Sequence, residues 1–142
     1  MKLTLALLFP LLLCTTVLAQ TPRGAVEFPN LITQSFYSDF PDAQNIHQRK
    51  VGSLYAFRFV LNGFTQEAHY SGTGTWSFTE ISVPENRMPP RSIEHCRSQY
   101  PGASILRTGY HDEEDNRFYH IEISLNGSTR QLRYDDDGNF IR

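Results

Sequence analysis

Apolar and polar residues alternate with a period of two in two stretches of the chain, residues 54–61 and 118–125. In the first stretch Tyr55 and Phe57 fall on one side and Arg58 falls on the other. Alternation of this kind is typical of a strand that has one buried face and one face in water. An Asn-Gly pair follows each stretch, and Asn-Gly favours the positive φ angles of a type I′ turn. The pattern therefore predicts two antiparallel hairpins.

A period of three and four residues comes before each predicted hairpin and indicates a short amphipathic helix. The apolar positions are Ile32, Phe36 and Phe40 in the first helix, and Ile93, Cys96 and Tyr100 in the second. Pro41 and Pro101 end these helices, because proline cannot donate a hydrogen bond to the preceding turn. Helices of about ten to twelve residues are unstable alone, so each is expected to pack against a sheet.

Most of the chain consists of two similar copies of one sequence pattern. Residues 28–43 match residues 88–103 at an offset of 60, and later pairs such as Tyr70 and Tyr134 match at an offset of 64. Each copy is expected to hold a first strand (near 45–50 or 105–110), a hairpin, a third strand that ends at Tyr70 or Tyr134, and a fourth strand at 76–78 or 140–141. The predicted fold class is therefore α+β, with two tandem repeats, each a helix packed on a four-stranded antiparallel meander.

The chain is predicted to divide into five parts: a signal peptide at 1–19, an N-terminal extension at 20–27, a first repeat at 28–83, a linker at 84–87 and a second repeat at 88–142. The signal peptide is indicated by Lys2, an apolar run and small residues before the cleavage position. A membrane anchor is disfavoured because Pro10 interrupts a run that is too short to span a bilayer. Lipidation of Cys14 stays open, although Leu13 is bulky where a lipobox needs a small residue.

Charge and cysteine content exclude some classes of protein. Without the signal peptide the chain carries 12 basic and 15 acidic residues, and no basic stripe indicates nucleic-acid binding. Cys96 is then the one cysteine that remains, so an intramolecular disulfide is excluded. Its counterpart in the first copy is Phe36, which favours a buried helix position over a reactive thiol.

Two acidic segments are candidates for binding calcium or a small ligand. Asp135 and Asp137 stand in a glycine-bearing turn, and carboxylates in such a turn are typical calcium ligands. The matching turn, residues 71–74, has no carboxylate, so turn chemistry alone explains both versions. The second segment, residues 111–116, is an insertion in the second copy and is expected to form a solvated hairpin tip.

No catalytic motif stands out in the chain. The five histidines have no HExxH spacing, and no G-x-S-x-G elbow, phosphate loop or dinucleotide fingerprint is present. The sequence therefore gives no positive evidence for an enzyme, a cofactor or a metal.

The open face of the predicted sheet is the main candidate for function. The alternation places on it Arg58, Thr65, Glu67, His69, His120, Glu122, Thr129, Gln131 and Arg133. A broad, polar, charged face is either plain solvated surface or a docking surface for a protein. Trp76 is a candidate anchor for a partner if it lies on this face, whereas its match with Phe140 favours the core.

The repeated pattern of the chain resembles the PepSY-like family of small exported bacterial proteins. In each copy a proline precedes a helix, which is followed by Tyr/Phe-Pro-Gly/Asp-Ala, a strand, a hairpin and Tyr/Phe-Asp-x-x-Gly-x-Trp/Phe. The likeness is carried by residues 40–43, residues 100–103, and the segments that begin at Tyr70 and Tyr134. The first copy departs from the pattern at Ser71, where the family has Asp.

The resemblance implies a fold like that of the β-lactamase-inhibitor protein, with two repeats whose sheets can join into one curved eight-stranded sheet. The duplicated scaffold, the absence of a catalytic motif and the broad polar face indicate an exported, non-enzymatic protein- or peptide-binding module, periplasmic or secreted. By analogy of fold alone, such a module can be inhibitor-like toward an envelope enzyme. We expect a protein or peptide partner, no nucleic acid, and no membrane insertion after the signal peptide is cleaved. The alternative is a small-ligand or calcium-binding envelope protein that uses the acidic loops.

Overall fold

The computed structural model describes residues 28–142, which form two helices, a short 3-10 helix and seven strands. The elements are α1 (Asn30–Asp39), β1 (Gln44–Val51), β2 (Leu54–Leu61), β3 (Phe64–Tyr70), β4 (Trp76–Ser82), η1 (Glu85–Arg87), α2 (Pro90–Gln99), β5 (Ser104–Asp112), β6 (Phe118–Leu125) and β7 (Ser128–Tyr134). The predicted signal peptide, Cys14 and the extension at 20–27 lie outside the described residues. No helix within residues 28–142 is long and apolar enough to cross a membrane.

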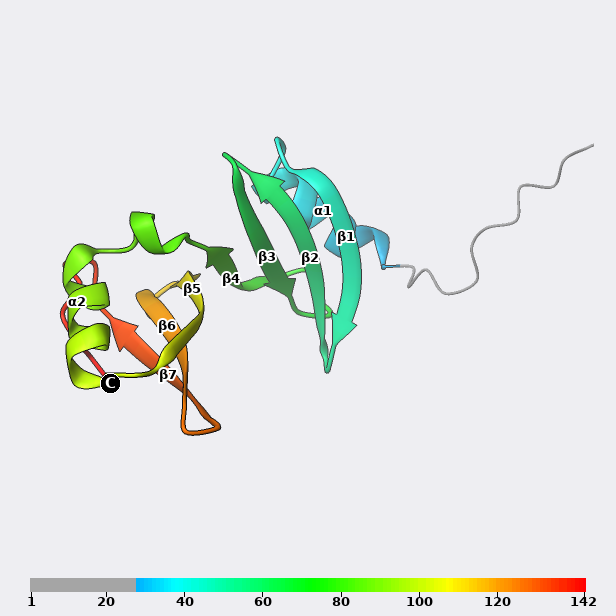
Figure 1. The fold of residues 1–142 in the computed structure, drawn as a ribbon. Coiled ribbons are helices and arrows are strands. Elements are labelled where there is room, and N and C mark those ends of the chain that lie inside the picture. The colour runs from blue at the N-terminus through cyan, green and yellow to red at the C-terminus, as the bar shows by residue number, and fades with distance from the viewer. Residues whose placement is uncertain (1–27) are drawn as a thin grey trace, which may run out of the picture.

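All seven strands belong to one antiparallel sheet, in which the spatial order of the strands equals their order along the chain. Figure 1 shows α1 against β1–β3 and α2 beside β5–β7, with β4 between the two halves. The halves are joined by pairing of β4 with β5, in which residues 79–82 lie opposite residues 112–109. The predicted α+β class is confirmed. Both helices cover the same side of the sheet, so no helix of residues 28–142 lies on the opposite side.

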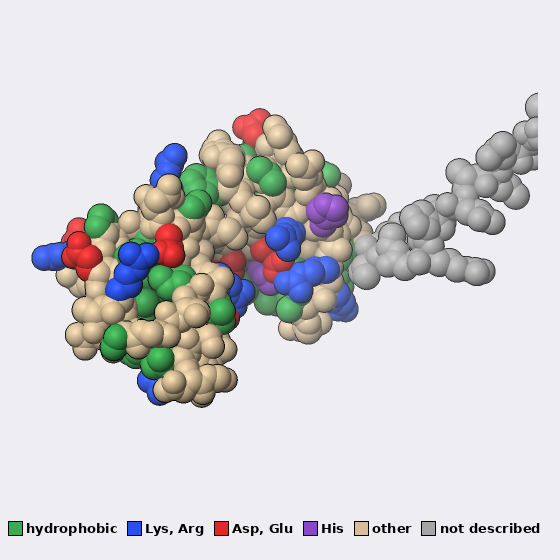
Figure 2. Space-filling model, in the orientation of Figure 1, with side chains coloured by type: hydrophobic (Ala, Val, Ile, Leu, Met, Phe, Trp, Pro, Cys, Tyr) green, Lys and Arg blue, Asp and Glu red, His purple; other side chains and the backbone are tan. Residues whose placement is uncertain are grey.

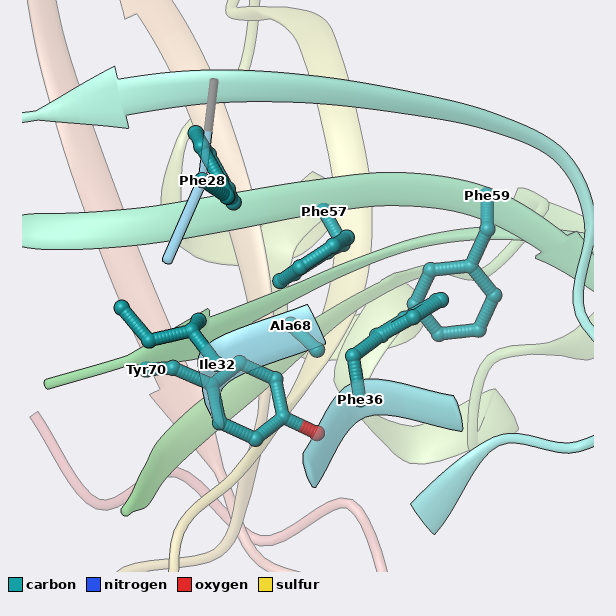
Figure 3. Packing of buried hydrophobic residues seen from close by; sticks show 7 residues of the cluster. All are labelled: Phe28, Ile32, Phe36, Phe57, Phe59, Ala68 and Tyr70. Carbon is teal, nitrogen blue, oxygen red and sulfur yellow. The ribbon is translucent and has the colours of Figure 1, made fainter. Parts of the chain in front are cut away.

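An aromatic cluster fixes α1 to the sheet (Figure 3). The Phe36 ring of α1 stacks on Phe57 of β2 at 4.1 Å between centroids and meets Phe59 edge-on at 5.2 Å. Phe28 packs edge-on against Phe57 at 5.1 Å, and Tyr70 closes the cluster while its hydroxyl donates to Asp39 at 2.7 Å. The alternation of β2 thus produces the predicted buried face.

The buried cluster under α2 is mainly aliphatic, with Tyr134 as its one aromatic member. It contains Val83, Met88, Cys96, Ile121, Ile123, Leu132 and Tyr134. Cys96 is only 2% exposed, which confirms the predicted buried helix position. Burial raises the pKa of its thiol above the ordinary value, so Cys96 stays protonated and unreactive at neutral pH.

The helix starts and the hairpin turns of the two halves lie where the sequence predicts them. Pro29 and Pro89 precede the helices with nearly equal backbone angles. Asn62 and Gly63 have φ angles of 53° and 80°, and Asn126 has 51°, so both hairpins have the positive φ angles that were predicted. These features are geometric likenesses between the halves, and the descent of both halves from one repeat stays a prediction.

Within residues 28–142 the sheet has seven strands, and the expected eighth strand is not confirmed. Phe140 forms only an isolated bridge with Tyr134. The Ile141 N–H donates to the Arg133 carbonyl at 2.8 Å, so this segment contacts β7 without forming a strand of its own. The predicted linker is also more ordered than its name implies: residues 85–87 form η1, and Arg97 of α2 donates to Glu85 at 2.9 Å.

Candidate binding face

The strand registers place the predicted residues of the open face together. Arg58 lies opposite Glu67, and Glu122 lies opposite Gln131. His120 of β6 lies opposite Arg133 of β7. Thr129 of β7 lies opposite Ser124, which is on the same side of β6 as His120. Thr65 and His69 share the side of β3 that carries Glu67, because they are two residues away from it.

Trp76 does not lie on this face. It is half-buried against the aromatic cluster under α1, and its indole N–H donates to Thr79 Oγ1 at 2.9 Å. The reason is a register shift between His69 and Tyr70, which pairs Tyr70 with Trp76 and His69 with Phe78. The irregularity exchanges the sides of β4, and its open face therefore presents Phe78 and Glu80.

Glu67 is held by two partners from neighbouring positions. Arg49 of β1 donates to its carboxylate from two nitrogens, and His69 Nε2 lies 3.0 Å from Oε1. Burial alone would raise the pKa of the Glu67 carboxyl, but Arg49, supported by His69, outweighs burial and holds that pKa below its ordinary value. Glu67 is therefore ionised and already paired at neutral pH.

His69 is buried and neutral. Its side chain is 7% exposed, and its Nδ1 atom has no hydrogen-bond partner among the described residues. Burial lowers the pKa of this imidazole below its ordinary value, since Arg49 already neutralises the nearby Glu67 carboxylate.

A second carboxylate, Glu80, bridges two histidines of neighbouring strands. His111 Nδ1 lies 2.7 Å from one Glu80 oxygen, and His120 Nε2 lies 3.1 Å from the other. Burial would raise the pKa of Glu80, yet these two contacts hold it below its ordinary value. His120 reaches Glu80 across Gly109, where a Cβ atom would lie only 2.6 Å from His120 Nε2. Glycine is therefore required at this position for the His120–Glu80 contact.

Planar groups form a continuous row across five strands of the open face. His69 stacks on Phe78 with 4.2 Å between ring centroids, Phe78 on His111 at 5.2 Å, and His111 on Phe118 at 4.7 Å. The Arg133 guanidinium closes the row 4.3 Å above the Phe118 ring. The row crosses the β4–β5 junction, so it stiffens the place where the two halves of the sheet meet.

Beside this row the face is hollowed. The hollow has a volume of about 440 Å³, and Arg49, Arg58, Glu67, Glu80, Arg107 and His120 are among the residues that line it. Arg107 forms an ion pair with Glu122. Figure 2 shows charged side chains of both signs and histidine gathered near the middle of the molecule, between the two halves.

In the acidic turn of residues 135–139 the Asp135 carboxylate hydrogen-bonds to groups of the same turn. Asp135 accepts hydrogen bonds from the backbone N–H groups of Asp137 and Asn139, at 3.0 and 2.8 Å, and from the Asn139 side chain at 2.9 Å. These contacts lower the pKa of Asp135 below its ordinary value. No cluster of three or more acidic, histidine or cysteine side chains suited to a metal ion occurs within residues 28–142.

The inserted segment 111–116 is not wholly a solvated tip. His111 belongs to β5, and its side chain is 12% exposed because it packs between Phe78 and Phe118 on the open face. Sequence analysis missed this residue, together with Arg49, Phe78, Glu80, Arg107 and Phe118. A second irregularity between Ile105 and Arg107 hides the side assignment in β5. The available signal was the parity of Phe118, which stands two residues before His120 and therefore shares its side of β6.

The arrangement of helices and strands is shared with solved structures from Bacteroides. A BLIP-like protein of Bacteroides fragilis has a TM-score of 0.73 at 17% identity, covering 84% of this chain and 86% of that chain. A DUF2874 family protein of Bacteroides ovatus has a TM-score of 0.72 at 19% identity, covering 82% and 86%. A candidate periplasmic protein of Bacteroides eggerthii has a TM-score of 0.72 at 13% identity, covering 82% and 88%.

The chain has a BLIP-like fold. At these identities the likeness establishes the fold and carries no residue of function across. No family model matches the chain, and no curated protein matches it.

Proposed function

We propose that this chain is an exported, non-enzymatic module that binds a protein or peptide on the open face of its sheet. The observation that carries the proposal is the hollow between the two halves, whose carboxylates Glu67 and Glu80 are held in fixed pairs. Export is supported by the predicted signal peptide and by the description of the Bacteroides eggerthii neighbour as a candidate periplasmic protein. We also propose that the two halves are PepSY-like repeats.

The side chains of the open face are more ordered than those of a plain solvated sheet face, which favours recognition of a partner. Side chains on solvated strands are free to change rotamer, and ordering them costs free energy when a partner binds. Here Glu67, Glu80 and Glu122 are each fixed by a pair, and His69 and His111 are fixed by stacking. A partner therefore meets side chains that are already ordered, which lowers the cost of association.

One form that such binding could take is inhibition of an envelope enzyme, since a broad sheet face can cover the mouth of an active site. The BLIP-like fold of the chain supports this form by analogy of architecture alone. The calcium alternative gains no support, because the Asp135 carboxylate bonds to its own turn.

Capture from an envelope extract of the source organism tests the binding face. The mature chain is immobilised beside a variant with Arg58→Glu and Arg133→Glu, and beside a matched control with Arg87→Glu and Arg97→Glu. The control changes the same charge on residues of η1 and α2, away from the open face. We expect a protein that the unaltered chain and the control retain and that the open-face variant loses; identical capture by all three would refute the assignment of the surface.

A further inference from the structure

The carboxylates of the open face are already paired within the chain. The registers place three of them on this side, and each has a cationic or histidine partner: Glu67 with Arg49 and His69, Glu80 with His111 and His120, and Glu122 with Arg107. A cationic group from a partner would have to displace one of these internal partners. Breaking a paired, partly buried carboxylate away from its donors is unfavourable, so the face is a poor receptor for basic segments.

Two guanidinium groups of the same face have no carboxylate partner among the described residues. Arg58 is exposed and lines the hollow, and its cross-strand neighbour Glu67 is already held by Arg49. Arg133 lies over the Phe118 ring and donates from Nε to Gln131 Oε1 at 3.2 Å, which leaves its terminal nitrogens for another acceptor. Arginine is well suited to this role, because its planar fork binds a carboxylate through two hydrogen bonds.

We propose that the segment which docks on this face is acidic and that its carboxylates pair with Arg58 and Arg133. This inference rests on the proposed binding function and adds the charge of the partner to it. The mature chain has an excess of acidic residues, so its net charge opposes non-specific attraction of an acidic segment. Binding of an acidic segment would therefore result from the local placement of Arg58 and Arg133 and not from the net charge of the chain.

The positions of the two arginines set the size of the docking segment. Arg58 lies on β2 and Arg133 on β7, five strand spacings apart in the sheet. At about 4.8 Å per spacing, the two sites are at most roughly 25 Å apart, because curvature of the sheet shortens the direct path. An extended chain covers about 3.3 Å per residue, so a segment of about eight residues with an acid near each end reaches both arginines.

A synthetic peptide can serve as the probe. We would use a ten-residue Ser/Gly peptide with Glu at its second and ninth positions, and the same peptide with Lys at those positions. Binding is followed at low salt through the arginine Nε–Hε signals in the NMR spectrum of the mature chain. We expect the Glu peptide to shift the signals of Arg58 and Arg133, and 0.5 M NaCl to reverse the shifts, since the contacts are exposed.

Variants establish which residues bind the peptide. Arg58→Gln and Arg133→Gln should each weaken the affinity for the Glu peptide about threefold to tenfold, and the control Arg97→Gln should leave it unchanged. Tighter binding of the Lys peptide, no binding of the Glu peptide, or an equal loss in Arg97→Gln would overturn the inference. If a captured partner is lost on Arg58→Glu with Arg133→Glu but neither peptide binds, the acidic segment is refuted while the binding function stands.

Discussion

His69 shows how burial sets the charge of a residue on an otherwise polar face. Its imidazole is stacked on Phe78 and nearly enclosed, and the nearby carboxylate is already neutralised by Arg49. Protonation would add a buried N–H at Nδ1, where the described residues offer no acceptor. The neutral form is therefore favoured in the folded chain, and the pKa of His69 lies below its ordinary value of 6.5.

This shift predicts a loss of stability in mild acid. When the pH falls below 6.5 the unfolded chain protonates His69 while the folded chain does not, so the unfolded state binds more protons and the free energy of unfolding decreases. At pH values above 6.5 both states are neutral, and this residue causes no pH dependence. The measurement is urea unfolding at several pH values between 5 and 8, combined with an NMR titration of the His69 ring.

His47 provides the matched control, because it lies on the same face opposite Arg58 but is exposed. Replacement of His69 by Gln should flatten the dependence of unfolding free energy on pH between 5 and 6.5, and the same replacement at His47 controls for the loss of a histidine from this face. A His69 titration midpoint above 6.5 would contradict the effect ascribed to burial.

At the scale of elements, the sequence foretold the helices and hairpins because local rules decide them. Pro29, the apolar steps of α1 and the Asn62-Gly63 turn each act over a few residues. Local rules could not predict which side chains of β4 and β5 lie on the open face. One extra residue in a strand, Ser77 between Trp76 and Phe78 in β4 or Leu106 between Ile105 and Arg107 in β5, reverses every side assignment beyond it. Such irregularities depend on tertiary packing.

The candidate site was therefore only partly predictable. Regular alternation in β2, β3, β6 and β7 predicts the side on which the registers place Arg58, Glu67, His120 and Arg133. Glu80 was missed because the extra residue Ser77 interrupts the alternation within β4, and His111 was missed because it stands at the start of a segment that looks like a loop. The side of Trp76 stayed open in the sequence analysis for the same reason, since the extra residue Ser77 beside it is invisible in the sequence.

The packing of α1 can be tested through its central aromatic residue. Phe36 is fully buried among Phe57, Phe59 and Tyr70. Replacement by Ala removes a large ring from a tightly packed site, and we expect unfolding to become easier by about 3–5 kcal/mol. Denaturant unfolding measures this loss.

Cys96 is the matched position in α2 and is almost equally buried. Its replacement by Ala removes far less apolar volume, so the loss of stability should be clearly smaller than for Phe36→Ala. Equal losses at the two positions would show that the aromatic cluster does not determine how firmly α1 is attached.

At the scale of the whole molecule, the sheet joins two separate cores into one surface. The clusters under α1 and α2 share no residue, and β4 pairs with β5 over only residues 79–82 and 109–112. The stacked row from His69 to Arg133 and the Glu80 contacts span this short junction on the open side. The place where the two halves join is thus also the place where a partner is proposed to dock.

Site-specific photo-crosslinking in living cells tests the open face most directly. A photoreactive amino acid is placed at Thr65 or Gln131, which line the hollow, and in control chains at Ser38 or Ser98, exposed positions on α1 and α2. We predict that both open-face positions form the same discrete adduct with a second protein and that neither helix position forms it. The same adduct from Ser38 or Ser98, with none from Thr65 and Gln131, would contradict the open sheet face as the binding surface.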